Sequence, residues 1–242
     1  MKATIAEQNL LQELAKIDAE LGRLRHAADN LPVVDEITRA QSDSATVGTQ
    51  LTRLIARRDE LAKDMRGHEV EAERLTTIAE EKQERLDAGT GMDSRQLLAL
   101  QKEIDHHLAA AEEAENLQLE AMEAHESISA DIERGEAKAA ELTATLTELI
   151  KRKESELGEL TSQMEDATAK RTATTAQISK PLTDAYEEAR ARTGSGIVLM
   201  LPDGTVDGGM DLSMTEIDQV RTMAEDEVFI NEDTGALIIR QR

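Results

Sequence analysis

Residues 89–94, Gly89-Thr90-Gly91-Met92-Asp93-Ser94, decide the fold because they separate two helical arms of equal length. The two glycines favour a loop, and Asp93 and Ser94 are residue types that commonly begin a helix. Residues 3–88 and 93–178 each span 86 positions, so one tight turn pairs the arms as an antiparallel hairpin. At a rise of about 1.5 Å per residue, an unbroken arm would extend roughly 130 Å.

Both arms have apolar residues at alternating spacings of three and four, which is typical of a coiled-coil seam. The second arm has such spacing from Leu97 to about Gln177. Arg58, His68 and Lys82 also fall on the seam, where long side chains can bury their stems and extend their polar ends into solvent. The first arm's seam is Leu10, Leu14, Ile17, Leu21 and Leu24, followed after a break by Leu51, Leu54, Arg58, Leu61, Met65, His68, Ala72, Leu75, Ala79, Lys82 and Leu86.

The stretch Asn30-Leu31-Pro32 interrupts the first arm. Proline lacks an amide hydrogen and disfavours helical backbone at the preceding residue, so the helix breaks or kinks near Pro32. The arms then form either a kinked hairpin or a compact bundle in which the chain fully reverses at Pro32. An alanine-rich sequence with 1% aromatic residues suits a narrow seam better than a wide core, which favours the kinked hairpin.

The segment after the hairpin changes character and predicts a small α/β unit over residues 179–242. Ser179-Lys180-Pro181 begins a short helix that ends near Arg192. A capping box at Ser213–Glu216 begins another helix. Three strands are expected at Ile197–Leu201, Val228–Ile230 and Ala236–Ile239, with a hairpin turn at Asn231–Gly235 between the last two. The fold class is therefore mainly α: a long kinked antiparallel coiled-coil hairpin over 1–178 and a small α/β domain over 179–242.

Composition excludes several classes of protein. The chain has no cysteine, which excludes a disulfide scaffold and a thiolate zinc site. The longest apolar stretch, Ile197–Leu201, is far shorter than the roughly 20 residues that cross a bilayer. The first residues contain no apolar signal segment, so we expect a cytoplasmic protein without a membrane partner.

Three stretches match a known pattern. Ser94–Ile104 is similar to K/R-E-L-x-x-L-Q-x-E-I, with Gln96 in place of the first Glu. Leu182–Glu188 is similar to L-x-x-x-Y-E-x, and Asp226–Arg240 follows D-E-V-V-x-C-x-x-C-G-R-I-L-V-R. With them the whole chain resembles the bacterial coiled-coil proteins with a C-terminal C4-type zinc ribbon, and its pattern is nearest to actinobacterial members. The resemblance implies a scaffold or chaperone-like role in secretion or motility systems, and some relatives are linked to nucleic acid.

The chain departs from this family at all four zinc-ligand positions. The first cysteine pair would fall at Thr205 and Gly208, and the second at Asn231 and Thr234. We therefore predict a degenerate zinc-ribbon-like domain without metal and no cofactor. Asn231 should close its own turn through an Asx hydrogen bond, Thr234 should do likewise more weakly, and Gly235 should keep a left-handed conformation. A small apolar core should replace the metal: Ile197, Leu199, Leu201, Met210, Leu212, Phe229, Ile230, Ile238 and Ile239.

No catalytic residues and no metal ligands stand out. Glu103 and His107 are ordinary helix-surface neighbours, and His68-Glu69 lacks the second histidine of the H-E-x-x-H zinc motif because Ala72 occupies that position. Two function classes remain. One is a non-enzymatic adaptor that presents the metal-free ribbon head to a protein partner, and the other is an RNA- or DNA-binding protein acting through the same domain.

Charge decides against the nucleic-acid alternative. The formal net charge is −22, and residues 201–242 contain ten acidic residues against three arginines. Such a domain is repelled by phosphate backbones. A protein partner is expected to contact Met92 and Arg95 at the hairpin tip, or Met210, Met214 and Phe229 on the head. A homodimer is an alternative, because the seam could equally pair with a second copy of the chain.

Overall fold

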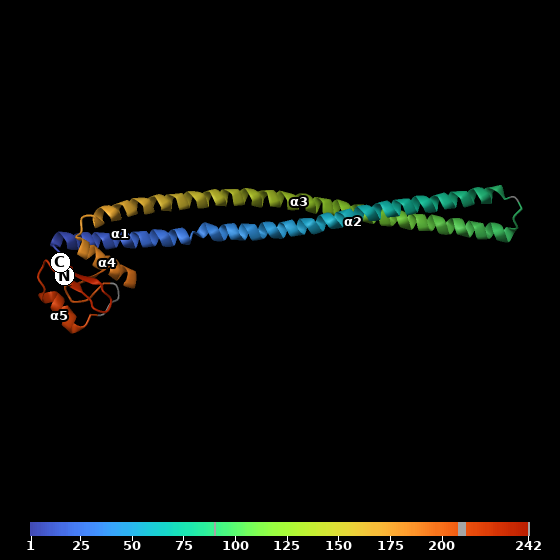
Figure 1. Ribbon diagram of the computed structural model, residues 1–242. Coiled ribbons are helices and arrows are strands. Elements are labelled where there is room, and N and C mark those ends of the chain that lie inside the picture. The colour runs from blue at the N-terminus through green and yellow to red at the C-terminus, as the bar shows by residue number, and fades with distance from the viewer. Residues whose placement is uncertain (90, 208–211, 242) are drawn as a thin grey trace. The chain divides into compact units, whose positions relative to one another are not determined.

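The computed structural model describes residues 1–89, 91–207 and 212–241. It is mainly helical, with a small mixed sheet near the C-terminus (Figure 1). The predicted fold class, mainly α with a long antiparallel coiled-coil hairpin and a small C-terminal α/β domain, is confirmed. The elements are α1 (Ile5–Asp29), α2 (Pro32–Ala88), α3 (Ser94–Thr175), α4 (Lys180–Thr193), β1 (Ile197–Met200), α5 (Met214–Thr222), β2 (Phe229–Ile230) and β3 (Leu237–Arg240).

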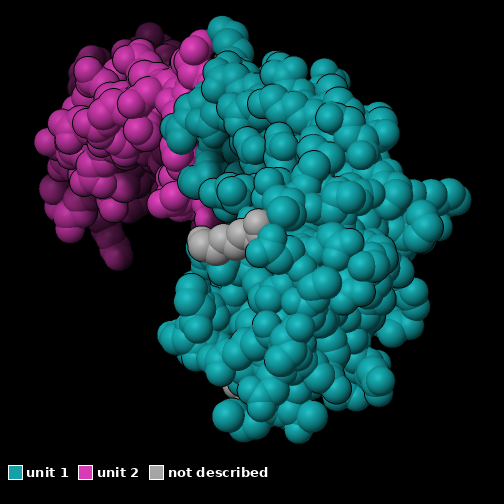
Figure 2. All heavy atoms as spheres, turned by 90° about the vertical axis from the view of Figure 1, so that its left-hand side faces the viewer, with its two compact units in different colours: residues 1–34, 151–242 teal, residues 35–150 magenta. Residues whose placement is uncertain are grey.

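The chain divides into two compact units (Figure 2). One contains Met1–Val34 and Lys151–Arg242, which we call the head unit, and the other contains Asp35–Ile150, which we call the arm unit. Helices α2 and α3 contribute residues to both.

The arm unit is an antiparallel pair formed by α2 and the first part of α3. Every residue of the predicted α2 seam from Leu51 to Leu86 is buried or half-buried. Lys82 extends from this seam and donates to Glu103 of α3 at 2.5 Å. Leu51 lies against Gly135, where an added Cβ would be 2.7 Å from a Leu51 methyl carbon. Both contacts fit the same antiparallel register of α2 and α3. The predicted pairing of the two arms is therefore confirmed for this unit.

The predicted helix break lies between Asp29, the last residue of α1, and Pro32, the first residue of α2. Asn30 ends α1 by donating from its amide and its side chain to the His26 carbonyl, at 3.1 and 2.8 Å. Proline suits the first helical position because the amide it lacks has no partner there. In the head unit, α1 packs along the end of α3, through a cluster of Ile17, Leu21, Ala167 and Met164. This is the pairing expected of the hairpin rather than of the compact bundle.

The C-terminal part of the head unit is a three-stranded sheet in the order β1-β3-β2. Strand β1 is parallel to β3, with Ile197 opposite Leu237, and β2 is antiparallel to β3. One apolar cluster joins the sheet to α1 and α4: Leu11, Leu14, Leu182, Tyr186, Ile197, Leu237 and Ile239. A second joins it to α5: Val198, Met200, Val220, Ala236 and Ile238, with Leu212 and Phe229 packed against them. The predicted core residues thus divide between these two clusters, except Leu201, which belongs to neither, and Met210, which lies outside the described residues.

The first residues of the chain belong to the same sheet region, which the sequence did not predict. The Met1 nitrogen donates to the Val228 carbonyl at 2.8 Å, and the Val228 amide donates back to Met1 at 2.9 Å. The Ala3 amide donates to the Asp226 carbonyl at 2.8 Å. The buried side chain of Gln8 donates to the Ala3 and Glu225 carbonyls at 2.9 and 2.8 Å. The two ends of the sequence therefore fold together.

Candidate functional site

The turn expected to replace the second zinc knuckle is closed by its own hydrogen bonds. The Asn231 side-chain oxygen accepts from the Thr234 amide and the Thr234 hydroxyl, both at 2.8 Å. The Thr234 hydroxyl oxygen also accepts from the Ala236 amide at 3.3 Å. Gly235 has φ 73°, in the left-handed region. The predicted Asx bond and glycine conformation are confirmed, and the Asn231 amide group further donates to Glu216 of α5 at 2.9 Å.

The turn at the first knuckle is closed in a similar way. The Asp203 carboxylate accepts from the Thr205 hydroxyl at 2.7 Å and the Thr205 amide at 2.9 Å. These hydrogen bonds, the hydroxyl's first, hold the Asp203 pKa below its usual value. Gly208 lies outside the described residues.

The polar groups at these positions do not fit a structural zinc ion. They are the hydroxyls of Thr205 and Thr234 and the amide of Asn231, all engaged in hydrogen bonds of their own turns, whereas structural zinc sites are built from thiolates and imidazoles. Across residues 1–89, 91–207 and 212–241, no three histidine, cysteine or carboxylate side chains gather where they could hold a metal. The zinc-ribbon ancestry of the domain stays a prediction.

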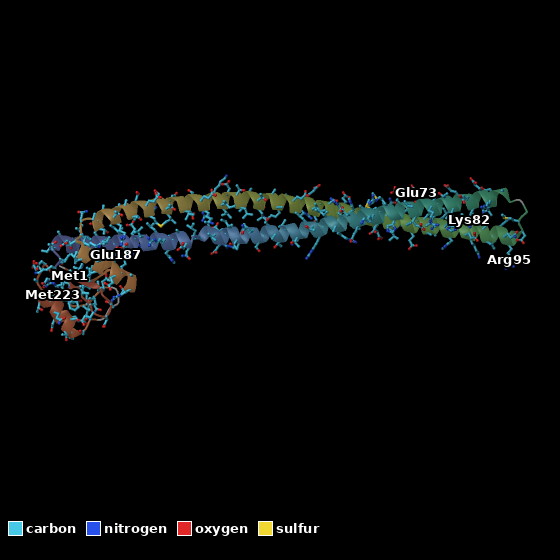
Figure 3. All side chains as sticks on the ribbon, in the orientation of Figure 1. Met1, Glu73, Lys82, Arg95, Glu187 and Met223 are labelled. Carbon is cyan, nitrogen blue, oxygen red and sulfur yellow. The ribbon has the colours of Figure 1, made fainter. Side chains whose placement is uncertain are left out.

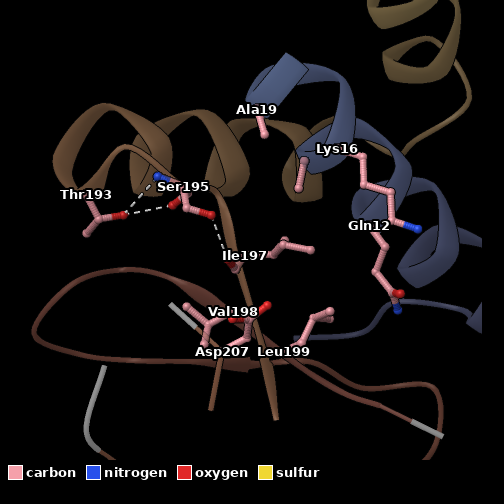
Figure 4. Close-up of a pocket in the computed structure, with 10 residues that line it drawn as sticks. Gln12, Lys16, Ala19, Thr193, Ser195, Ile197, Val198, Leu199 and Asp207 are labelled. Carbon is pink, nitrogen blue, oxygen red and sulfur yellow. Dashed lines mark hydrogen bonds between the residues drawn. The ribbon is translucent and has the colours of Figure 1, made fainter. Parts of the chain in front are cut away.

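A groove of about 340 Å³ lies in the head unit, between α1 and the edge strand β1 (Figure 4). Gln12, Ala15, Lys16 and Ala19 of α1 form one wall. The other walls come from the end of α4, from β1 and from one residue beyond it: Thr193, Ser195, Ile197, Val198, Leu199 and Asp207. Small alanines on one wall and branched apolar side chains on the other make room for an apolar group.

The outer edge of β1, beside this groove, is only partly paired. The backbone amides of Val198 and Met200 point toward β3. This follows from the parallel ladder, in which the amides of Leu237 and Gln241 donate to the carbonyls of Gly196 and Met200. On the outer edge, the Ile197 carbonyl accepts from the Ser195 hydroxyl at 2.7 Å, and the Leu199 carbonyl accepts from the Asp207 amide at 2.9 Å.

Residues 205–207 already pair with one end of this outer edge, where Val206 lies opposite Met200 and the Leu201 amide donates to the Thr205 carbonyl. The amides of Ile197 and Leu199 alternate with those paired to β3, and they make no backbone hydrogen bond to another described residue. Lys16, across the groove, makes no ion pair with any described residue either. The groove therefore combines apolar walls, two backbone donors and one cation. It can accept an apolar side chain, the carbonyl oxygens of an extended segment and a carboxylate.

A charged cluster fixes the wall of this groove. Asp18, two residues after Lys16 in α1, accepts from Arg171 of α3 at 2.7 Å and from the Tyr186 hydroxyl of α4 at 2.8 Å. Arg171 also pairs with Glu187 of α4. Burial alone would raise the Asp18 pKa, but the hydrogen bonds from Arg171 and Tyr186 outweigh it and hold that pKa below its usual value. Burial, and then the Asp18 hydrogen bond, raises the pKa of Tyr186.

The residues predicted to contact a partner do not gather at this groove. Met92 and Arg95 belong to the arm unit, where Asp93 caps α3 by accepting from the amides of Arg95 and Gln96 at 3.0 and 2.8 Å. Arg95 is labelled in Figure 3. In the head unit, Met214 is 73% exposed at the start of α5, whereas Phe229 is half-buried against the α5 cluster. Met210 lies outside the described residues. Sequence reasoning missed Lys16 and Ala19, because on a helix surface they look like any coiled-coil flank.

Comparison with known proteins identifies the family. The model of the CT398-like coiled coil hairpin domain matches residues 14–194, and the chain belongs to this family. Two uncharacterized proteins of Mycobacterium tuberculosis, from strains CDC 1551 / Oshkosh and ATCC 25618 / H37Rv, are each 30% identical to it over 130 residues. These matches cover 54% of this chain and 53% of each relative, so the chain spans about half the length of the curated relatives it matches.

Solved structures share the fold. A protein from Mycobacterium smegmatis has a TM-score of 0.79 at 24% identity, with 100% of both chains covered. CT398 from Chlamydia trachomatis has a TM-score of 0.69 at 12% identity, with 98% of this chain and 99% of that chain covered. Within the described residues, none of the helices combines the length and the apolar character needed to span a bilayer.

Proposed function

We propose that this member of the CT398-like coiled coil hairpin family is a non-enzymatic adaptor whose head unit holds an extended segment of a protein partner in the groove between α1 and β1. The observation that supports this most is the pair of unpaired amides at Ile197 and Leu199 on the edge of the sheet. An edge strand with free donors can hydrogen-bond an added strand through its backbone, and neighbouring pockets then select side chains.

The chemistry of the groove favours a peptide over a nucleic acid. Ala15 and Ala19 leave space for a partner side chain, and Lys16 can pair with a partner carboxylate. Base stacking, by contrast, needs aromatic platforms, and the head unit has only the buried Tyr186 and the half-buried Phe229. The chain's net charge of −22 also opposes a phosphate backbone.

The test is affinity capture from native lysate with the full chain and two matched tryptophan variants. Ala19→Trp fills the groove from an exposed position on α1, and Ala27→Trp adds the same bulk at an exposed α1 position outside the groove. We expect one protein to be captured by the unmodified chain and by A27W, and lost with A19W. Circular dichroism confirms that both variants stay folded.

A parallel nuclease treatment separates the two function classes. Recovery that survives nuclease supports the adaptor, whereas loss of all captured material on nuclease treatment supports RNA or DNA binding. Equal capture by A19W and A27W contradicts the groove as the binding site.

A further inference from the structure

The arm unit has an exposed apolar stripe in addition to its buried seam. In α3 the seam takes Leu97, Leu100, Ile104 and the residues that continue this spacing, all of them buried or half-buried. Leu98 and Leu108 are 61% and 48% exposed, and Leu119 and Met122 are 56% and 44% exposed. Counted in the seam's seven-residue repeat, these four residues occupy only two positions, both on the same flank of the seam. They form a stripe rather than a scatter.

The same flank of the arm unit is strongly acidic. A groove of about 520 Å³ between α2 and α3 is lined by Glu69, Glu73, Glu80 and Glu115. Glu73 is labelled on α2 in Figure 3. We call the surface formed by these acidic residues and by Leu98, Leu108, Leu119 and Met122 the acidic leucine face. Its exposed carboxylates make no ion pair with any residue of the described ranges: Glu69, Glu73, Glu80, Glu112, Glu115 and Glu126.

The opposite flank of the same unit has more ion pairs of its own. Arg74 pairs with Glu71, Lys82 with Glu103, and Arg134 with Asp131. The corresponding pairs Arg57–Glu60 and Lys138–Glu141 also lie on that flank by the seven-residue count. On the acidic leucine face, Arg58–Asp59 is the pair present among described residues. Fewer carboxylates are therefore paired beside the exposed leucines. Arg66 also lies on that flank, and Glu113 and Glu120 on the opposite flank make no ion pair with a described residue.

We propose that the acidic leucine face binds one amphipathic helix of a protein partner, with apolar residues on one side and lysines or arginines flanking them. Leu98, Leu108 and Leu119 recur every ten or eleven residues, about three helical turns, so they lie in line on one flank and can act as apolar anchors for one helix. The unpaired carboxylates select a basic helix by charge complementarity. From Leu98 to Met122 the stripe extends about 36 Å, so the partner helix has about 24 residues. A second copy of this chain is disfavoured, since two such faces would repel.

The probe is a synthetic peptide of about 24 residues with leucines at alternating spacings of three and four and lysines on the flanks. A scrambled peptide of the same composition has the same charge but no apolar stripe. Binding to the full chain is measured by fluorescence anisotropy at two salt concentrations. We expect the amphipathic peptide to bind about tenfold more tightly than the scrambled one, and its affinity to fall as salt rises.

Variants with matched controls locate the binding. The double variant Leu108→Gln with Leu119→Gln should weaken the amphipathic peptide about tenfold, because it removes two anchors. Leu117→Gln, at 42% exposure on the opposite flank, should change affinity less than about twofold. Glu112→Gln with Glu115→Gln should weaken binding and flatten its salt dependence, whereas Glu113→Gln with Glu120→Gln on the opposite flank should not.

Three outcomes overturn the proposal. Equal binding of the two peptides shows that only net charge acts. Equal loss in the control variants shows that no particular face is used. Conversion of a dimer to a monomer by the Leu108/Leu119 double variant, seen by analytical ultracentrifugation, shows that the face joins two copies. The proposal concerns residues 98–126 with α2 and does not depend on the groove beside β1.

Discussion

Raising the pH past the ordinary pKa of tyrosine should destabilise the head unit through one side chain. Tyr186 is completely buried and donates its hydroxyl to Asp18 at 2.8 Å. Burial is the main cause, and the Asp18 hydrogen bond the second, of a raised Tyr186 pKa in the folded chain. The unfolded chain should lose this proton near pH 10, the ordinary tyrosine value. Because the folded state keeps the proton longer, the free energy of unfolding must fall as pH rises above about 10.

The size of this effect follows from one proton. Each pH unit above the unfolded pKa costs about 1.4 kcal/mol until the folded pKa is reached. Between about pH 10 and pH 11.5 the loss is therefore about 2 kcal/mol. Lysines also titrate in this range, so the comparison is with Tyr186→Phe, which keeps the ring and removes the titrating group. Over this pH range, the free energy of unfolding of the unmodified chain should fall by this amount more than that of the variant.

The assay is specific because the chain has a single tyrosine and no tryptophan. Tyrosinate absorbance near 295 nm therefore reports on Tyr186 alone. In the folded chain, the absorbance step should appear only when circular dichroism shows unfolding, whereas in denaturant it should appear near pH 10. A step near pH 10 in a chain that is still folded would refute the buried Tyr186–Asp18 hydrogen bond.

Three further variants test the packing and the turns, each by chemical denaturation followed through Tyr186 fluorescence or circular dichroism. Gly196→Ala should destabilise the head unit by about 1–3 kcal/mol, because its Cβ would lie 2.3 Å from the Tyr186 ring. As a control, Gly158→Ala, in a helix where the added Cβ would have nothing within 4 Å, should stabilise the chain by about 0.5–1 kcal/mol. Equal effects of the two variants would contradict the packing of Tyr186 against Gly196. Asp18→Asn should lower the free energy of unfolding by about 1.5–3 kcal/mol at neutral pH. Because the Asp18 pKa is lowered in the folded chain, this stability is present above the unfolded pKa of about 3.9 and is lost as pH falls through the folded pKa. The free energy of unfolding of the variant should therefore depend less on pH in the acid range. Asn231→Ala should cost about 1–3 kcal/mol by removing the acceptor of two hydrogen bonds, and a change below about 0.5 kcal/mol would rule out that role.

The periodic part of the fold was predictable from the sequence. The α2 seam from Leu51 to Leu86 repeats without a slip, and the structure buries or half-buries every member, including Arg58, His68 and Lys82. Proline at residue 32 and the capping Asp93 likewise have local causes, so the break and the start of α3 could be located closely. The Asn231 turn was predictable for the same reason, because an Asx hydrogen bond depends only on residues adjacent in the sequence.

Contacts between distant segments were not predictable. Met1 pairs with Val228, and nothing in the first three residues has the pattern of a strand. In α1, Leu11 is fully buried whereas the predicted seam residue Leu10 is half-buried, because α1 packs on the sheet and α4 as well as on α3. The groove arises from this same packing: Lys16 borders it only because α1 lies beside the edge of β1.

Amide hydrogen exchange along β1, followed by NMR with the full chain, tests the binding groove most directly. Without a partner, Ile197 and Leu199 should exchange faster than Val198 and Met200, whose amides are paired with β3. Once the captured partner is added, all four amides should be protected. Slow exchange at Ile197 and Leu199 in the free chain, or no added protection with the partner present, would contradict an open edge that receives an added strand.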